Sequence, residues 1–402
     1  MESAIHYLQA WADSYREDLV ENIMPFWLKH GLDGKYGGVY TCVNRDGSLM
    51  DTTKSVWFQG RFGFIAAFAY NNVAKKPEWL AASKSCIDFI EKHCFDKDGR
   101  MYFEVKEDGT PLRKRRYVFS ECFAAIAMSE YALASGDHSY AEKALELFKR
   151  IQGFIAAPGV LEPKYLDTLK AQGHSITMIL INTASRIRAV INDPVLDSQI
   201  DASIAVLKKY FVHPEFKALL EMVGPDGEFI DTCNGRVINP GHCIETAWFI
   251  LEEAKYHNWD KELVELATTI LDWSWEWGWD KEFGGIINFR DCRNLPCQDY
   301  SQDMKFWWPQ TEAIIATLYA YQATGDGKYL EMHRQISHWT YAHFPDKEYG
   351  EWYGYLHRDG TVAQPAKGNI FKGPFHIPRM MVKSYVLCNE LLLKNDLNLN
   401  IS

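Results

Sequence analysis

Apolar residues along most of the chain recur at the spacing of an α-helix, and short segments rich in glycine, aspartate and aromatic residues separate these stretches. An apolar position every three to four residues predicts a helix. Several of the stretches are apolar around most of their circumference, which is typical of helices buried on both sides. The expected helices span 55–70, 119–134, 141–154, 242–256, 259–273, 309–321 and 379–393.

The segments between the helices resemble one another. Each reads as a turn, a short strand and a second turn, which predicts a small hairpin. Clear copies begin at Gly31, Phe95, Gly278 and Phe344. Two weaker copies, near Gly159–Tyr165 and at 224–230, complete a series with a period of about 55 to 65 residues.

Helix pairs separated by six such hairpins predict an all-α fold, an (α/α)6 barrel with short β-hairpins in the loops at one end. An open stack would expose the apolar helices at its ends, whereas a closed ring of inner and outer helices buries them. No linker-like segment interrupts the pattern, so we expect residues 1–402 to form a single domain. The loops at one end of such a ring surround a central cleft, where we expect the function.

Composition and charge narrow the class of protein. The chain has 402 residues, 47% of them hydrophobic, and a formal net charge of −10, which argues against nucleic acid as a partner. Residues 1–17 read as an acidic amphipathic helix rather than a secretory signal, and no apolar run reaches the roughly 18 residues of a membrane span. The nine cysteines are scattered like incidental thiols. We therefore expect a cytoplasmic protein with a small-molecule partner and no membrane partner.

The segment NPGHCIE contains the first candidate for chemistry, His242. Pro240 and Gly241 halt the preceding strand, and a helix then opens that places His242 and Glu245 on one face. A carboxylate beside an imidazole holds its tautomer and raises its basicity. The alternative is a histidine that only caps or packs at a helix start.

The segment KGPFHIPR contains a second candidate, His376, with Arg379 within reach of the same pocket. Its prolines predict an extended, rigid loop before the last long helix. The alternative is a loop stiffened for packing. Two imidazoles in one pocket can serve as a proton donor and a proton acceptor near neutral pH.

Three further segments hold candidate binding residues. Trp307, Trp308 and Glu312 could form a carbohydrate wall, because indole faces stack on sugars and carboxylates accept hydroxyl groups; core packing and a helix-dipole partner are the alternatives. Arg61, in an apolar helix, needs either an internal anionic partner or the negative charge of a reaction. His174, at a helix start, is a candidate of the same kind, with packing as its alternative.

Motifs for several other chemistries are missing from the sequence. It has no phosphate-binding Gly-x-x-x-x-Gly-Lys-Ser/Thr loop, no His-Glu-x-x-His and no Gly-x-Ser-x-Gly. Cys292 and Cys297 are a close pair without a second pair, so no metal site is expected. Nucleotide hydrolase, metalloprotease and serine hydrolase functions are therefore not supported.

Six motifs in order from about Trp27 to Arg379 resemble those of the N-acylglucosamine 2-epimerase family, called renin-binding protein in mammals. They read WFQGR, FSEC, NPGHCIE, KFWWPQTE, EYGEW and FKGPFHIPR. The resemblance implies an (α/α)6 barrel that interconverts N-acetylglucosamine and N-acetylmannosamine, a sialic acid precursor. It also implies a homodimer and a reaction that needs neither a metal nor a redox cofactor. ATP would be an allosteric activator, as in mammalian and cyanobacterial relatives, although no nucleotide-binding motif is recognisable.

The resemblance also implies roles for the candidate residues. His242 and His376 match the two catalytic histidines, and Arg61 matches the arginine of the pocket. One histidine would remove the proton on C2 of the open-chain sugar and the other would return a proton on the opposite face, while Arg61 stabilises the enolate oxygen. The supporting and sugar-contacting positions are Glu245, Glu312, Arg379, Trp307, Trp308 and, with a looser match, His174.

Three alternatives remain at this point. Cellobiose 2-epimerases and aldose-ketose isomerases share the histidine pair. A glycosidase would use two carboxylates across the cleft, for which Glu245 and Glu312 could serve, but this leaves both histidines without a role. A non-catalytic binding protein is suggested by the mammalian name.

Overall fold

The computed structural model describes residues 4–166 and 168–399; residues 1–3 of the predicted N-terminal helix lie outside them. Contacts divide the chain into two compact units. Unit 1 contains Ile238–Pro365 and the two terminal segments, up to Phe26 and from His376. Unit 2 contains Trp27–Val237 and Ala366–Phe375.

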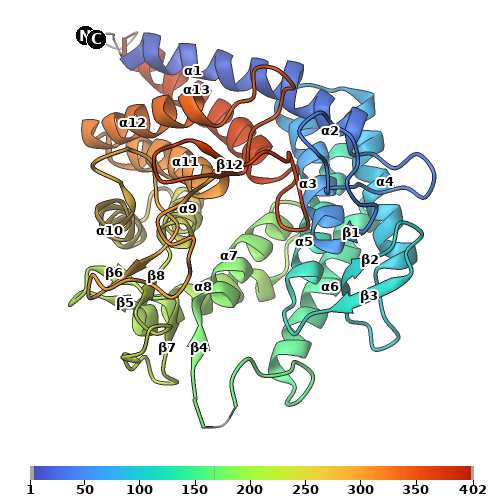
Figure 1. Ribbon diagram of the computed structural model, residues 1–402, viewed down its shortest axis with the longest axis horizontal. Helices are drawn as coiled ribbons and strands as arrows, with labels where there is room; N and C mark the ends of the chain where they lie inside the picture. The colour runs from blue at the N-terminus through green and yellow to red at the C-terminus, as the bar shows by residue number, and fades with distance from the viewer. Residues whose placement is uncertain (1–3, 167, 400–402) are drawn as a thin grey trace. The chain divides into compact units, whose positions relative to one another are not determined.

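Unit 2 is built from pairs of adjacent helices (Figure 1). The first helix of each pair is buried on most sides, and the second buries one face against it. The first helices α3 and α5 contact each other, and so do α5 and α7. The pairs are α3 (Val56–Asn72) with α4 (Pro77–His93), α5 (Phe119–Ser135) with α6 (Ser139–Ala156), and α7 (His174–Arg188) with α8 (Pro194–Val206).

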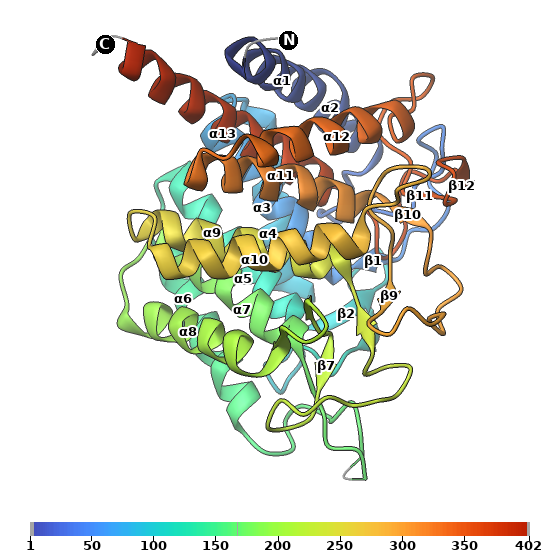
Figure 2. The ribbon, with the colours of Figure 1, turned by 90° about the vertical axis from the view of Figure 1, so that its left-hand side faces the viewer.

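Unit 1 repeats this arrangement, and one of its pairs joins the first and last helices of the chain. Figures 1 and 2 both show α1 beside α13. Helix α11 contacts both α9 and α13. The pairs are α9 (Pro240–Tyr256) with α10 (Lys261–Gly278), α11 (Trp307–Thr324) with α12 (Gly327–His343), and α13 (His376–Leu399) with α1 (Ala4–Asp18). The expected helices are thus confirmed, with ends that differ by a few residues.

Short helical and extended segments complete the two units. Two antiparallel sheets have the strand orders β1-β2-β3 and β10-β11-β12, and β4 pairs with β7 as β5 does with β6. Their bounds are η1 (Leu19–Ile23), α2 (Met24–His30), η2 (Leu207–Phe211), β1 (Lys54–Ser55), β2 (Tyr102–Val105), β3 (Pro111–Lys114), β4 (Gln172–Gly173), β5 (Val212–His213), β6 (Ala218–Leu219), β7 (Met222–Val223), β8 (Val237–Ile238), β9 (Arg290–Asp291), β10 (Lys305–Phe306), β11 (Tyr355–Leu356) and β12 (Val362–Gln364).

The four clear hairpin predictions are confirmed, and one weak copy is wrong. Antiparallel bridges close the clear copies at Leu32↔Val39, Phe95↔Met101, Trp279↔Ile286 and Pro345↔Trp352. At 224–230 the chain forms a turn in which Gly224 N donates to Glu228 O at 2.8 Å. The segment near Gly159–Tyr165 contains turns and bends but no strand among its described residues. Pro158 and Pro163 explain this, because neither has an N–H for a ladder.

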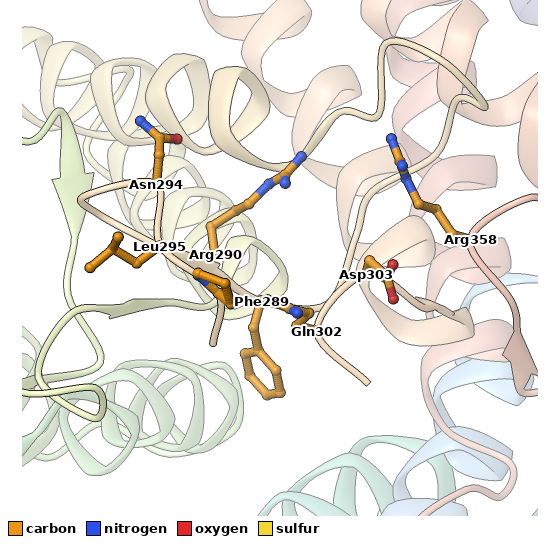
Figure 3. Close-up of a pocket in the computed structure, with 8 residues that line it drawn as sticks. Phe289, Arg290, Asn294, Leu295, Gln302, Asp303 and Arg358 are labelled. Atoms are coloured by element: carbon orange, nitrogen blue, oxygen red, sulfur yellow. The ribbon is translucent and has the colours of Figure 1, made fainter. Parts of the chain in front are cut away.

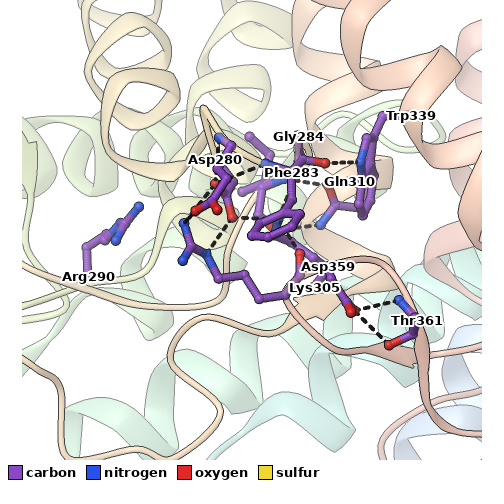
Figure 4. Close-up of polar contacts among 12 residues, drawn as sticks. Asp280, Phe283, Gly284, Arg290, Lys305, Gln310, Trp339, Asp359 and Thr361 are labelled. Carbon is purple, nitrogen blue, oxygen red and sulfur yellow. Dashed lines mark hydrogen bonds and ion pairs between the residues drawn. The ribbon is translucent and has the colours of Figure 1, made fainter.

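A polar lock holds the hairpin before α11 against the start of that helix (Figure 4). Gln310 Oε1 accepts from Ile286 N and its Nε2 donates to Ile286 O, both at 2.7 Å. Lys305 Nζ donates to Asp280 Oδ2 at 3.1 Å and to Gly284 O. Gln310, Lys305 and Asp280 are all buried, so the lock satisfies polar groups that burial would otherwise penalise.

Unit 2 contains the same lock before α3. Gln59 pairs with N and O of Val39 at 2.8 Å, and Lys54 Nζ donates to Asp33 Oδ2 at 2.6 Å. The two copies therefore align residue by residue. Two positions after each glutamine the chain carries a predicted site residue, Arg61 in unit 2 and Glu312 in unit 1.

Candidate active site

Four predicted site residues of unit 1 form one buried polar cluster on the inner helices α9, α11 and α13. Arg379 Nη2 bonds Glu245 Oε1 at 2.5 Å and Glu312 Oε2 at 2.8 Å. His376 Nδ1 lies 2.7 Å from the other oxygen of Glu312. All four residues are at most 7% exposed. Burial opposes the charge of Arg379, but Glu312 and Glu245 outweigh it and raise the guanidinium pKa.

The tautomer of His376 follows from its partner. A carboxylate can only accept, so Nδ1 carries the proton and donates to Glu312. Arg379 Nη2 lies 3.3 Å from the same nitrogen. Because both nitrogens carry a proton in this assignment, this longer contact is not a hydrogen bond. Proton exchange with a substrate would therefore take place at Nε2.

His376 is the first residue of α13, not part of an extended loop as predicted. Pro378 falls in the first turn of this helix, where a backbone N–H has no intrahelical partner and proline is tolerated. The rigid support expected of the loop thus comes from a helix start.

His242 has a different partner from the one its spacing predicts. Helix α9 begins at Pro240 with Asn239 as N-cap, and Asn239 Oδ1 accepts from His242 N at 3.1 Å. The amide nitrogen of Asn239 lies 3.1 Å from Nδ1 of the His242 ring. Glu245, the expected partner, instead bonds Arg379 from α13.

Trp308 brings the two histidines to one surface. Its ring centroid lies 5.0 Å from that of His242 and 5.8 Å from that of His376. Gly241 allows this approach, because a Cβ there would stand 2.5 Å from the indole. Trp307 is only 3% exposed and packs edge-on against Tyr355, so Trp308 is the better placed of the two for a sugar.

Sequence reasoning missed two residues of the site, Asn239 and Trp248. Trp248 Nε1 donates to Glu312 Oε2 at 2.8 Å, and the Arg379 guanidinium lies 5.2 Å from its ring. The sequence feature that could have identified Trp248 is its place three residues after Glu245 on the same helix. That signal is weak in a chain with 14 tryptophans.

The cluster also has the ligand atoms of a metal site. One oxygen of Glu245, one of Glu312 and a ring nitrogen of His376 all lie within 4.8 Å of one another. However, Arg379 already lies among them and supplies a positive charge to both carboxylates. This donor set is therefore matched to an arginine rather than to a metal ion.

Arg61 projects from α3 in unit 2 into aromatic side chains. Its guanidinium carbon lies 4.2 Å from the ring centroid of Phe123 and 4.7 Å from that of Phe375. Trp57 and Phe58 lie 5.3 and 5.2 Å away. Such cation–π contacts stabilise a partly buried guanidinium and fix its position.

His174 is the first residue of α7 in unit 2 and is fully buried. Its Nδ1 lies 3.4 Å from Glu221 Oε1, and its backbone N donates to Glu221 O at 3.1 Å. Glu221 therefore positions this histidine through both its backbone and its side chain.

Unit 1 also has an open hollow of about 300 Å³ on the loop before β10 (Figure 3). Arg358, at one side, forms two bonds with Asp280, and Arg290 donates through Nε to Trp277 O. A carboxylate thus matches the charge of Arg358, whereas Arg290 bonds a backbone carbonyl. The lining residues are Phe289, Arg290, Asn294, Leu295, Pro296, Gln302, Asp303 and Arg358.

The chain is similar to known sugar epimerases over nearly its whole length. The family model for N-acylglucosamine 2-epimerase (GlcNAc 2-epimerase) matches residues 38–372. N-acylglucosamine 2-epimerase of Bos taurus is 33% identical over 98% of this chain and 94% of its own length. Cellobiose 2-epimerase of Ruminococcus albus is 25% identical over 92% of this chain and 96% of its own length.

Solved structures show the fold. Cellobiose 2-epimerase from Bacillus thermoamylovorans B4167 superimposes with a TM-score of 0.84 at 22% identity, covering 94% of this chain and 99% of that one. The predicted (α/α)6 barrel is thereby confirmed.

Proposed function

Because this chain belongs to the N-acylglucosamine 2-epimerase family, we propose that it interconverts N-acetyl-D-glucosamine and N-acetyl-D-mannosamine. The observation that carries this proposal is the pair His242 and His376 beside one indole, Trp308. A two-base epimerisation needs two proton-transferring groups at one substrate, and imidazole is suited to this near neutral pH.

The reaction would proceed on the open-chain sugar. One histidine removes the proton on C2, which is acidified by the adjacent C1 aldehyde, and the electron pair moves into an enolate with its charge mainly on O1. The other histidine delivers a proton to C2 from the opposite face. Arg61 is our candidate for stabilising O1, because a guanidinium held in position before the reaction needs no reorganisation when charge develops.

The buried cluster would position His376 and balance its charge. Glu312 holds Nδ1, so the ring can accept a proton on Nε2 and remain bonded to Glu312 as an imidazolium. Arg379 and Glu245 bring the cluster, with a protonated His376, to a formal charge of zero. We propose that Trp308 contacts the sugar, that Trp307 and Glu245 support the site, and that His174 binds substrate.

The test is NMR of N-acetylmannosamine in D₂O with the enzyme, which reports both epimerisation and deuterium at C2. We expect His242→Asn and His376→Asn to lower the rate of epimerisation by about 10² to 10⁴-fold. The exposed His138→Asn is the matched control and should leave the rate unchanged. Near wild-type rates in either site variant would contradict the mechanism.

A second candidate is a cellobiose 2-epimerase or aldose-ketose isomerase of the same superfamily, which the likeness to cellobiose 2-epimerases favours. We rank it second because identity to the N-acylglucosamine enzymes is higher. Parallel assays of N-acetylmannosamine, mannose and cellobiose distinguish the candidates by the substrate with the highest kcat/KM.

The remaining expectations concern the setting of the reaction. We propose a cytoplasmic homodimer that needs no metal or redox cofactor, supplies or consumes a sialic acid precursor, and responds to ATP as an activator rather than a substrate. Light scattering on the purified chain tests the dimer. Assays after EDTA dialysis test whether a metal is needed, and assays with and without ATP test its action as an activator.

A further inference from the structure

Asn239, the N-cap of α9, contacts His242 twice with one amide group. Its Oδ1 accepts from the backbone N–H of His242 at 3.1 Å, and its Nδ2 lies 3.1 Å from Nδ1 of the ring. Because a backbone N–H can only donate, the first contact fixes which end of the amide is the oxygen. The end that faces the ring is therefore the NH₂ group.

This orientation decides the state of the ring nitrogen. An amide NH₂ can only donate, so Nδ1 of His242 must accept, and it has no proton. In a neutral ring the proton then resides on Nε2. Protonating Nδ1 would set two donors against each other, and turning the amide by half a rotation would set its NH₂ against the backbone N–H that it now caps.

His376 has the opposite arrangement, because its Nδ1 donates to the Glu312 carboxylate. We propose that Asn239 is a positioning residue that keeps Nδ1 of His242 unprotonated, so that the two histidines hold opposite neutral tautomers. His242 then presents an Nε2–H donor, and His376 presents an Nε2 acceptor.

The meaning of this asymmetry for catalysis rests on the proposed function. When both rings are neutral, His376 is the one whose Nε2 can take the C2 proton. In that half-reaction the C2–H bond breaks, the proton goes to Nε2 of His376, and the electron pair stays on the sugar as the enolate. The imidazolium formed keeps its bond to Glu312, which stabilises it.

The first test reads the tautomers directly and needs no substitution. Ring ¹⁵N chemical shifts of the full chain labelled with [¹⁵N]histidine, taken above the titration of both rings, separate protonated from unprotonated nitrogens. Spectra of His242→Gln and His376→Gln assign the signals. We expect an unprotonated Nδ1 in His242 and a protonated Nδ1 in His376. A protonated Nδ1 in neutral His242 would overturn the proposal.

Two substitutions at Asn239 separate its contact with the ring from its contact with the helix. Asp and Ser are both good N-caps, so Asn239→Asp and Asn239→Ser should keep the start of α9. The aspartate can accept from Nδ1–H and should switch His242 to that tautomer, whereas serine is too short to reach the ring and should leave a mixture. An unchanged His242 spectrum in folded Asn239→Asp would also overturn the proposal.

Kinetics of the same variants complete the test. With the wrong tautomer, Asn239→Asp should lower kcat for C2 exchange of N-acetylmannosamine by about 10²-fold while KM changes little, because general acid–base catalysis is impaired. An Asn239→Asp enzyme with switched tautomer and wild-type kcat would overturn the catalytic part. Absence of C2 exchange in the wild type, with the tautomers as expected, would contradict the proposed function and leave the tautomer assignment intact.

Discussion

Arg379 joins the two carboxylates of the site, Glu245 and Glu312, through one guanidinium nitrogen. A buried carboxylate without a counter-charge is costly, and this arginine supplies the counter-charge to both. Its planar group also fixes the direction of the Glu312 oxygen that holds the histidine. One residue thus fixes the position of the Glu312 carboxylate and supplies the positive charge beside both carboxylates.

Changing Arg379 should separate these two contributions. Arg379→Lys keeps the charge but loses the fixed geometry, and we expect kcat/KM to fall by about 10²-fold because small displacements of catalytic groups are costly. Arg379→Met removes the guanidinium that pairs with both buried carboxylates and should lower the free energy of unfolding by about 3 to 5 kcal/mol. Urea denaturation measures the second effect, with the exposed Arg16→Met as control. Equal activities of the lysine variant and the wild type would contradict this role.

At the scale of elements, the hairpin lock recurs in a further hairpin, the one before α5, with one change. In unit 2, Glu121 on α5 takes the place of Gln310 and accepts from Met101 N at 2.9 Å. Arg100 Nε donates to the same oxygen at 2.7 Å and supplies a positive charge beside the carboxylate. In the unit 1 hairpin the residue at the place of Arg100 is Gly285, with φ +74°. A Cβ there would stand 2.7 Å from the ring of Trp339.

A carboxylate at position 310 should therefore destabilise the protein. Gln310→Glu loses the NH₂ that now donates to the carbonyl oxygens of Ile286 and Phe306, and no arginine is present to compensate. We expect a loss of about 2 kcal/mol or more in the free energy of unfolding, measured by urea denaturation. The exposed Gln335→Glu on α12 is the control. Wild-type stability of Gln310→Glu would contradict the importance of the lock.

The contact between α1 and α12 contains a buried histidine that should make stability depend on pH. The ring of His333 lies 2.7 Å from the Tyr7 hydroxyl and 3.0 Å from the Tyr15 hydroxyl. Burial, with smaller contributions from His338 and Arg334, lowers its pKa from 6.5 to about 3. Below its ordinary pKa the ring takes up a proton in the unfolded chain but not in the folded one.

Acid should therefore favour unfolding through this residue. Its contribution to stability is complete above about pH 6.5 and decreases as the pH falls toward 3, by up to about 1.4 kcal/mol per pH unit. Urea denaturation between pH 7 and pH 4 should show a shallower pH dependence for His333→Gln than for the wild type. The exposed His138→Gln should retain the wild-type slope. Identical slopes for His333→Gln and the wild type would contradict this account.

For the whole molecule, unit 1 is discontinuous in sequence, because it contains both ends of the chain. The pair α1 and α13 joins these ends, so unit 1 cannot be completed until the last helix is present. None of the described helices combines the length and apolar composition needed to cross a membrane.

That residues 1–402 form one domain stays a prediction, and calorimetry can test it. A single domain should unfold in one transition whose calorimetric enthalpy equals its van't Hoff enthalpy. Scans at two heating rates check that the transition is reversible. Two resolved transitions would instead indicate that the units unfold separately.

The sequence by itself determined the helices, the clear hairpins and the identity of most candidate residues. These features depend on local patterns: the periodicity of apolar residues, the glycines and prolines of turns, and short motifs around His242 and His376. The weak copy near Gly159–Tyr165 failed for an equally local reason, since its prolines exclude strand pairing.

Only the tertiary structure decided which side chains meet. Local spacing favoured Glu245 as the partner of His242, yet Glu245 bonds Arg379, 134 residues later in the chain, and Glu312 bonds His376, 64 residues later. Such pairs depend on how α9, α11 and α13 pack, and the period of a helix contains no information about a partner on another helix. The tautomer of His376 follows from its long-range contact with Glu312, whereas the tautomer proposed for His242 follows from the local contact with Asn239.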